Sequence, residues 1–150
     1  MIRFTVPGPP QGKQRARVVR VRNRVMGYTP AETATYENLI RMEFKLAYPG
    51  HVPIDGPITV EILAFFGAPK YVRTRKGYGA DYAESVRHTK RPDADNVAKI
   101  CCDGMNGVVW HDDSQIADLT IRKRYSTSPR TEIIIRSDTD NSAEQSTPCR

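Results

Sequence analysis

Residues 91–113 read RPDADNVAKICCDGMNGVVWHDD, and residues 95–105 of this stretch separate into two faces when they are placed on a helix. At about 100° per residue, one arc of that helix is apolar or small. This arc holds Val97, Ile100, Cys101, Gly104 and Met105. The opposite arc holds Asp95, Lys99 and Asp103. The pattern predicts a helix that packs one face into a core and presents a lysine between two carboxylates on the other.

Carboxylates also flank this predicted helix on both sides. Asp93 precedes it, where a short acidic side chain can cap free amide groups. Asp112 and Asp113 follow it after GMNGVVW, a segment long enough for the chain to reverse. If the chain reverses, at least three carboxylates converge, and a hard divalent cation such as Mg²⁺ or Mn²⁺ relieves their repulsion.

The role of Lys99 has two interpretations. In the first, the aspartates only cap and pair, and Lys99 forms an exposed ion pair with Asp95 worth about 0.3–0.5 kcal/mol. In the second, Lys99 lies beside a metal and stabilises charge that builds up on a phosphate. Basic segments on either side of the motif favour the second interpretation, a phosphodiester hydrolase.

Two other kinds of metal site fit the sequence poorly. The three cysteines form no CxxC pair, the three histidines are scattered, and adjacent Cys101 and Cys102 are typical of a buried helix face. An EF-hand loop counted from Asp93 requires glycine and glutamate where this chain has Ala98 and Gly104. Neither a structural zinc site nor a calcium loop is therefore expected.

Positive charge is concentrated in two segments of a chain whose formal net charge is +6. Residues 1–27 contain seven basic residues and no acidic one, which favours a surface that faces phosphates. Residues 11–26 predict a basic hairpin that turns near Asn23, and residues 67–91 predict a long, mobile basic loop. The candidate DNA-binding residues are Lys13, Arg15, Arg17, Arg20, Arg22, Arg24, Lys70, Arg73, Arg75, Lys76, Lys90 and Arg91.

The remaining patterns predict a single compact α+β domain over residues 1–136, with a mixed or antiparallel sheet and two main helices. Strands are expected at residues 2–6 and 58–66, and an antiparallel hairpin at residues 119–124 and 132–136. Thr29-Pro30-Ala31-Glu32 predicts the start of the first helix, capped by Thr29, which continues to about Tyr48. Residues 137–150 predict a disordered tail.

Several of these motifs together resemble the RusA-type Holliday junction resolvases, which are common in phages and prophages. The matching stretches are IRFTVPGPPQGKQRARV, YTPAETATYE and KRPDADNVAK followed by DGMNGVVWHDDSQI, within residues 1–136. The resemblance implies a homodimeric endonuclease of DNA recombination and repair. It would bind four-way junctions and, with Mg²⁺ or Mn²⁺, nick two strands symmetrically.

The resemblance also implies roles for individual residues. It aligns the catalytic and metal-binding aspartates of the family with Asp93, Asp95 and Asp113, and the essential lysine with Lys99. Asp112 adjoins them as a further metal ligand. Two alternatives remain: a branched-DNA or flap nuclease of phage replication, and a non-catalytic basic module that binds nucleic acid. With no apolar run of about 18 residues and no secretory signal, we expect a cytoplasmic protein of a bacterial or phage-infected cell.

Overall fold

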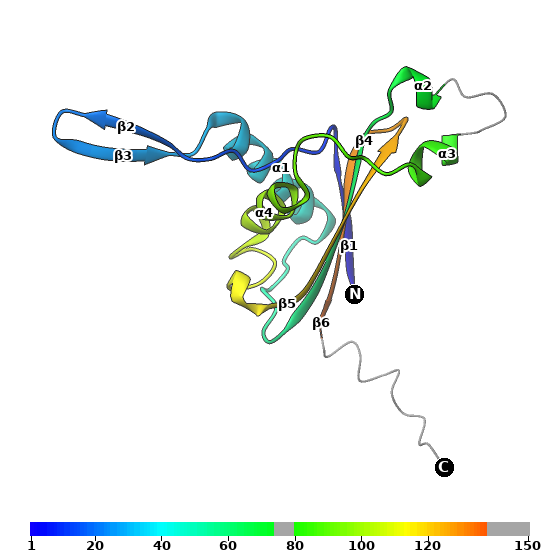
Figure 1. Cartoon of the computed structure of the whole chain (residues 1–150). Coiled ribbons are helices and arrows are strands. Elements are labelled where there is room, and N and C mark those ends of the chain that lie inside the picture. The colour runs from blue at the N-terminus through cyan, green and yellow to red at the C-terminus, as the bar shows by residue number, and fades with distance from the viewer. Residues whose placement is uncertain (74–79, 138–150) are drawn as a thin grey trace, which may run out of the picture.

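A four-stranded mixed sheet forms the centre of the molecule (Figure 1). The computed structural model describes residues 1–73 and 80–137. In spatial order the strands are β1 (Ile2–Pro7), β6 (Arg130–Ser137), β4 (Ile58–Gly67) and β5 (Ile116–Ser126). β6 is antiparallel to both of its neighbours, and β5 is parallel to β4. The predicted α+β domain with a mixed sheet is confirmed.

The last two strands do not form the predicted antiparallel hairpin. β4 lies between them, and the short connection 127–129 passes from the outer strand β5 to β6 on the other side of β4. Nearness in sequence favours a hairpin, but β4 has no exposed residue before Gly67 and is best covered in the interior of the sheet. β5 exposes residues 117–120 and suits the edge.

The two main helices, α1 (Ala31–Ala47) and α4 (Ala94–Met105), cover one face of this sheet (Figure 1). All five residues of the predicted apolar arc of α4 are buried, so that prediction is confirmed. The helices approach closely at Gly104, where an added Cβ would lie 3.1 Å from a side-chain carbon of Ile40. Side chains of α1, α4, β4 and β6 form the main core, which includes Phe44, Ile62 and Ile133.

The start of α1 differs from the predicted capping box. The helix begins at Ala31, with Pro30 as the N-cap, and no side chain caps it. The residues of its first turn contact the preceding segment instead. Gln14 Nε2 donates to a carboxylate oxygen of Glu32 at 2.8 Å, and the backbone N–H of Gln14 donates to Thr33 Oγ1 at 3.3 Å. The capping prediction was wrong because this tertiary contact uses Glu32.

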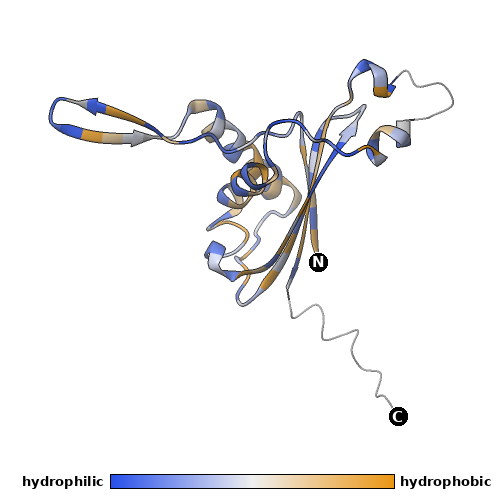
Figure 2. Ribbon diagram, in the orientation of Figure 1, coloured by the Kyte–Doolittle hydropathy of each residue, from blue (hydrophilic) through white to orange (hydrophobic). Residues whose placement is uncertain are grey.

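The predicted basic hairpin is confirmed over part of its range. β2 (Arg17–Val21) and β3 (Arg24–Tyr28) pair antiparallel in a separate two-stranded sheet, which we call the arm. The arm extends away from the main sheet, and hydrophobic and hydrophilic residues alternate along it (Figures 1 and 2). Arg22 has a φ of 51° at the turn between the two strands.

Residues 67–91, predicted as a loop, contain two short helices among the described positions. These are α2 (Lys70–Arg73) and α3 (Ala80–Ser85). Val72 and Ala83 are buried in a second apolar cluster with Phe66 and Tyr125, so tertiary packing orders residues with little apolar periodicity. Arg75 and Lys76 lie outside the described residues, and so does almost all of the predicted tail. Within the described ranges, no helix is long and apolar enough to span a membrane.

Candidate active site at the start of helix α4

Residues 11–15, which we call the strap, cross the start of α4 at close range. The backbone N–H of Lys13 donates to the carbonyl of Asn96 at 2.8 Å. At Gly12 an added Cβ would lie 2.5 Å from Pro92 Cβ, a separation that ordinary carbon contacts do not reach. Only glycine therefore lets the strap lie against the turn that leads into α4.

An open groove of about 720 Å³ lies between the strap and the start of α4. It is lined by Gln11, Gly12, Lys13, Gln14, Arg15, Arg91, Pro92, Asp93 and Asn96. Basic and amide side chains predominate, and Asp93 contributes a carboxylate. The groove thus combines groups that hold phosphates with a group that can hold a cation.

Asp93 and Asp95 occupy the N-terminal end of α4 with exposed side chains. Asp93 has the N-cap position predicted for it, but its side chain makes no capping hydrogen bond. Capping therefore does not account for this carboxylate, and its oxygens remain open to another partner. Two carboxylates two residues apart supply the hard oxygen donors that Mg²⁺ and Mn²⁺ prefer.

Lys123 of β5 supports the turn that precedes Asp93. Its ammonium donates to the carbonyls of Lys90 at 2.7 Å and Pro92 at 2.5 Å. Burial lowers the pKa of Lys123, and the negative charge of Asp93 opposes this effect. Lys123 therefore holds the backbone beside Asp93, and its positive charge acts on the Asp93 carboxylate.

Lys99 and Lys13 share one carboxylate, that of Asp103. The Lys99 ammonium lies 3.3 Å from Asp103 Oδ1, and the Lys13 ammonium lies 2.8 Å from Asp103 Oδ2 and 2.5 Å from Glu37 Oε1. The ion pair of Lys99 thus forms with Asp103, one turn later, and not with Asp95. Burial alone would lower the pKa of Lys13, but Asp103 and Glu37 raise it above its usual range. Lys13, which is predicted to contact DNA, lines the groove and also ties the strap to α4 and α1; its contact with DNA stays a prediction.

The two aspartates after α4 have different environments. Asp112 accepts a hydrogen bond from the backbone N–H of Ser114 at 2.9 Å, which caps a short 3₁₀ helix (Asp113–Gln115) and lowers the pKa of Asp112. Asp113 Oδ1 accepts a hydrogen bond from Nε1 of buried Trp110 at 2.9 Å.

The charge of Asp113 also acts on the C-terminal part of α4. Burial, followed by the charges of Asp113 and Asp103, raises the pKa of the Cys102 thiol to about 12, while Lys99 opposes the effect. The chain turns directly after α4, where the backbone N–H groups of Val108 and Val109 donate to the Met105 carbonyl at 3.0 and 2.9 Å. Trp110, which donates to Asp113, is part of the same core cluster as Cys102 and Met105. Cys102 and Cys101 are buried, as predicted for a core face.

The carboxylates do not yet form a complete metal cage. Among residues 1–73 and 80–137, no three acidic, histidine or cysteine side chains are grouped closely enough to hold a metal ion. The predicted convergence of at least three carboxylates is therefore not found among the described residues; Asp112 and Asp113 instead accept hydrogen bonds from Ser114 and Trp110. The donor chemistry of Asp93, Asp95 and Asp113 nevertheless fits a hard divalent cation.

Comparison with known proteins identifies the family. A family model described as endodeoxyribonuclease RusA matches residues 7–136. The chain belongs to the RusA endodeoxyribonuclease family. It is also 32% identical over 137 residues to the uncharacterized protein YqaN of Bacillus subtilis (strain 168), a match that covers 90% of this chain and 95% of that protein. Membership of the RusA family implies endodeoxyribonuclease activity and supports branched DNA as the substrate.

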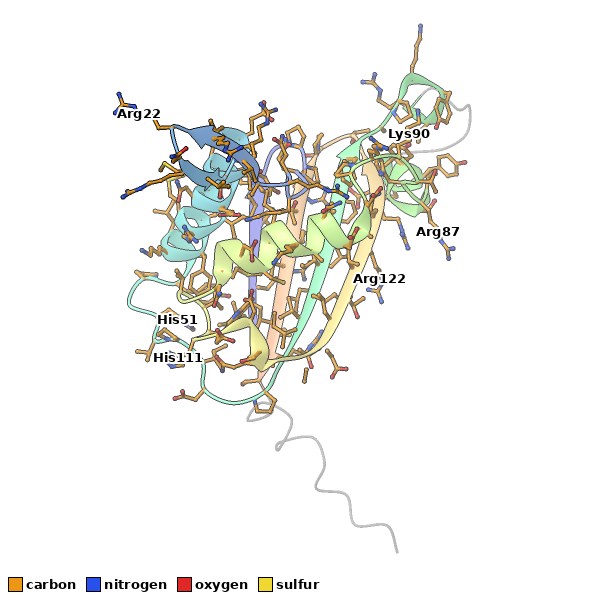
Figure 3. All side chains as sticks on the ribbon, turned by 60° about the vertical axis from the view of Figure 1, so that its left-hand side comes forward. Arg22, His51, Arg87, Lys90, His111 and Arg122 are labelled. Atoms are coloured by element: carbon orange, nitrogen blue, oxygen red, sulfur yellow. The ribbon has the colours of Figure 1, made fainter. Side chains whose placement is uncertain are left out.

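The predicted DNA-binding residues of this RusA family member fall into three places. Arg15 and Arg91 line the groove. The arm carries Arg17, Arg20, Arg22 and Arg24, all exposed. Lys70 and Arg73 of α2 are exposed, and so is Lys90. Figure 3 shows Arg22 and Lys90 at opposite sides of the molecule with α4 running between them. The basic surfaces therefore flank the carboxylates on two sides.

Sequence reasoning missed two residues of this site, Lys123 and Glu37. Lys123 stands between Arg122 and Arg124, so the sequence alone does not distinguish it from its basic neighbours. Strand alternation offered a signal, because Lys123 shares a face with Ile121 and Tyr125, where a lysine needs polar partners. Glu37 had no such signal, since only the folded chain brings it to Lys13.

Proposed function

We propose that this RusA family member is a Mg²⁺- or Mn²⁺-dependent endonuclease that resolves four-way DNA junctions by paired, symmetric nicks. The observation that carries the proposal is the groove, where the uncapped carboxylate of Asp93 lies beside Arg15 and Arg91. A phosphodiester held by these arginines would have its phosphorus next to the carboxylates. Guanidinium groups suit this role because they bind phosphate oxygens in a bidentate manner.

Asp93, Asp95 and Asp113 would hold the metal, with Asp112 as a neighbouring ligand. When bound, such a cation polarises the phosphate and activates water. One of these aspartates is held in place by a neighbouring side chain. Trp110 orients Asp113 through its Nε1 hydrogen bond.

Lys99 would stabilise the charge that develops on the phosphate. Its side chain is 64% exposed, and within residues 1–73 and 80–137 its one ion-pair partner is Asp103, at 3.3 Å. An exposed pair of this kind is weak, so the ammonium can turn toward a bound phosphate at little cost. Asp103 remains neutralised by Lys13 when Lys99 leaves, because the Lys13 contact is the shorter one.

A homodimer accounts for paired nicks. A four-way junction in its open form has two-fold symmetry, and a two-fold dimer would present one groove to each of two equivalent strands. In this form the protein would act in recombination and repair in a bacterial or phage-infected cell.

Cleavage of a synthetic four-way junction and of a linear duplex with the same sequence tests the proposal. With Mg²⁺, wild type should nick the junction at two symmetric positions and leave the duplex intact. Asp93→Asn and Lys99→Ala should each reduce cleavage at least about 100-fold. Asp118→Asn, at an exposed position of β5 outside the groove, is the matched control and should cleave like wild type.

Each other outcome would indicate a different substrate, function or active site for this protein. Equal cutting of junction and duplex would rule out junction selectivity, and preferential cutting of a flap or a replication fork would indicate a branched-DNA nuclease of replication. Binding that depends strongly on salt, without nicking under any metal condition, would indicate a non-catalytic module. Full activity of Asp93→Asn would show that the active site lies elsewhere.

Metal binding can be measured without DNA. Trp110 is the single tryptophan of the chain, it is buried, and it contacts Asp113. Adding Mn²⁺ should quench its fluorescence in a saturable manner, and Asp93→Asn should weaken the apparent affinity. Unchanged fluorescence in wild type up to millimolar Mn²⁺ would contradict a metal site at Asp113.

A further inference from the structure

The arm is poorly covered by the rest of the described chain. Its two strands pair only with each other in a two-stranded sheet, and they extend away from the body (Figure 1). A two-stranded ribbon is marginally stable in water without further packing. Contact with a binding partner that covers the arm would therefore stabilise it.

Apolar side chains on the arm are exposed to an unusual degree. The exposed fractions are 68% for Val18, 42% for Val19, 69% for Val25 and 60% for Met26. The strand register places Val19 directly opposite Met26. Because directly opposite residues of an antiparallel pair project from the same face, these two side chains form an apolar pair on one face of the ribbon.

Arginines bracket this apolar pair. Arg17 and Arg24 each lie two residues from a member of the pair, so they project from the same face. Residues 11–28 contain no acidic side chain. The face thus offers an apolar ridge between two guanidinium groups, and its partner should combine apolar area with flanking negative charge.

Branched DNA meets this description better than a regular duplex. In a duplex the apolar faces of the bases are hidden by stacking, and only phosphates and groove edges are accessible. At a branch point the stack is interrupted, and unstacking a base there costs less than it does within a helix. Apolar side chains of minor-groove proteins contact bases in this way, between residues that hold phosphates.

The arm is also a continuation of the groove. The strap that lines the groove leads directly into β2, and Val19 is the fourth residue after Arg15. Four extended residues span at most about 14 Å, which corresponds to roughly four base-pair steps of 3.4 Å. A strand held in the groove would therefore bring the branch point within reach of the apolar pair.

From this geometry we propose that Val19 and Met26 form a wedge that contacts unstacked bases at the branch point, while Arg17 and Arg24 hold the flanking phosphates. The inference rests on the proposed function and adds the feature by which the protein distinguishes a junction from a duplex. It also predicts that the cut lies within about four nucleotides of the branch point.

Binding without metal to a junction that carries 2-aminopurine at the branch tests the wedge. Wild type should raise the fluorescence of the probe as the base leaves the stack, and Val19→Ser/Met26→Ser should abolish most of this rise. The same variant should lose about ten-fold or more in junction affinity and less than about two-fold in duplex affinity. Because both side chains are exposed, its thermal stability should match that of wild type.

Two further variants separate the contribution of the apolar pair to junction binding from that of exposed apolar area in general and from that of the two arginines. Met42→Ser/Leu46→Ser removes two exposed apolar side chains from α1 and should bind and unstack the junction like wild type. Arg17→Gln/Arg24→Gln should weaken binding to both DNAs and reduce the salt dependence of the affinity by up to about two charges. This general loss differs from the junction-specific loss expected for the apolar pair.

The inference is overturned if the Val19/Met26 variant raises 2-aminopurine fluorescence as wild type does. It is also overturned if light scattering of the free proteins shows that this variant alone loses a dimer, because a second copy would then be what covers the ridge. In either case wild type still prefers and cuts the junction. If wild type itself neither prefers nor cuts the junction, the proposed function has failed instead.

Discussion

Replacing Gly12 with alanine should damage the groove more than it damages the fold. The new Cβ would lie 2.5 Å from Pro92 Cβ, 3.3 Å from Pro92 Cγ and 3.4 Å from Asn96 Cβ. Ordinary carbon contacts require about 3.5 Å or more, so the strap and the turn before α4 must separate by about 1 Å. The 2.8 Å hydrogen bond from Lys13 to the Asn96 carbonyl then lengthens beyond a useful distance.

The two effects of this separation have different sizes. Overpacking and one lost backbone hydrogen bond should lower the free energy of unfolding by about 1–3 kcal/mol, because the strap lies outside the main core. Displacing groups around a reacting phosphate by about 1 Å can reduce the rate roughly 100-fold. We therefore expect a folded protein whose junction cleavage is reduced about 10- to 100-fold.

Urea denaturation and single-turnover junction cleavage measure these two quantities. Gly67→Ala is the control, because its added Cβ would lie 3.7 Å from Pro129 Cγ, an ordinary contact. It should unfold and cleave like wild type within a factor of about two. A Gly12→Ala protein with wild-type stability and cleavage would show that the strap is not held against the turn, which would refute the reasoning.

Three further changes follow from the same contacts. Lys123→Met should release the turn before Asp93 and reduce cleavage about ten-fold or more, whereas Arg122→Met, at the exposed neighbouring position, should not. Asp103→Asn should lower the free energy of unfolding by about 1–2 kcal/mol in urea, since its charge holds both lysine partners; an unchanged midpoint would contradict this role. Burial alone would raise the pKa of Glu132, but its arginine partners hold it below the usual value of 4.5. The stability from this group is therefore complete above about pH 4.5 and is lost as the pH falls through the lowered pKa, so the urea midpoint of Glu132→Gln should fall less steeply in acid than that of wild type.

Much of α4 and its surroundings could be predicted from local pattern. The spacing of Val97, Ile100 and Met105 determines which face of the helix is buried, because helical geometry repeats every 3.6 residues whatever surrounds it. The alternation in β1 and the turn between β2 and β3 were predictable for the same reason. Likewise, an aspartate directly before the apolar period of α4 is typical of an N-cap, and Asp93 occupies that position.

The failures arose where distant segments compete for the same partner. Glu32 was expected to complete a cap for α1, but its carboxylate accepts from Gln14, which comes from a segment 18 residues away. β5 and β6 are neighbours in sequence, but β4 separates them because a strand with buried or half-buried residues along nearly all of its length is best covered in the interior. No local pattern records such competition.

The sequence by itself determined the amphipathic helix, its acidic face, the basic arm and the membership of the RusA family, because periodicity, charge and ordered motifs survive without tertiary context. Only the tertiary structure decided how these parts meet. It brings Lys13 to Asp103 and Glu37, places Lys123 under the turn before Asp93, and leaves the Asp93 carboxylate without a cap. The physical reason is that these contacts join residues from separate elements, and their energies exist only once the strap, the helices and β5 have packed together.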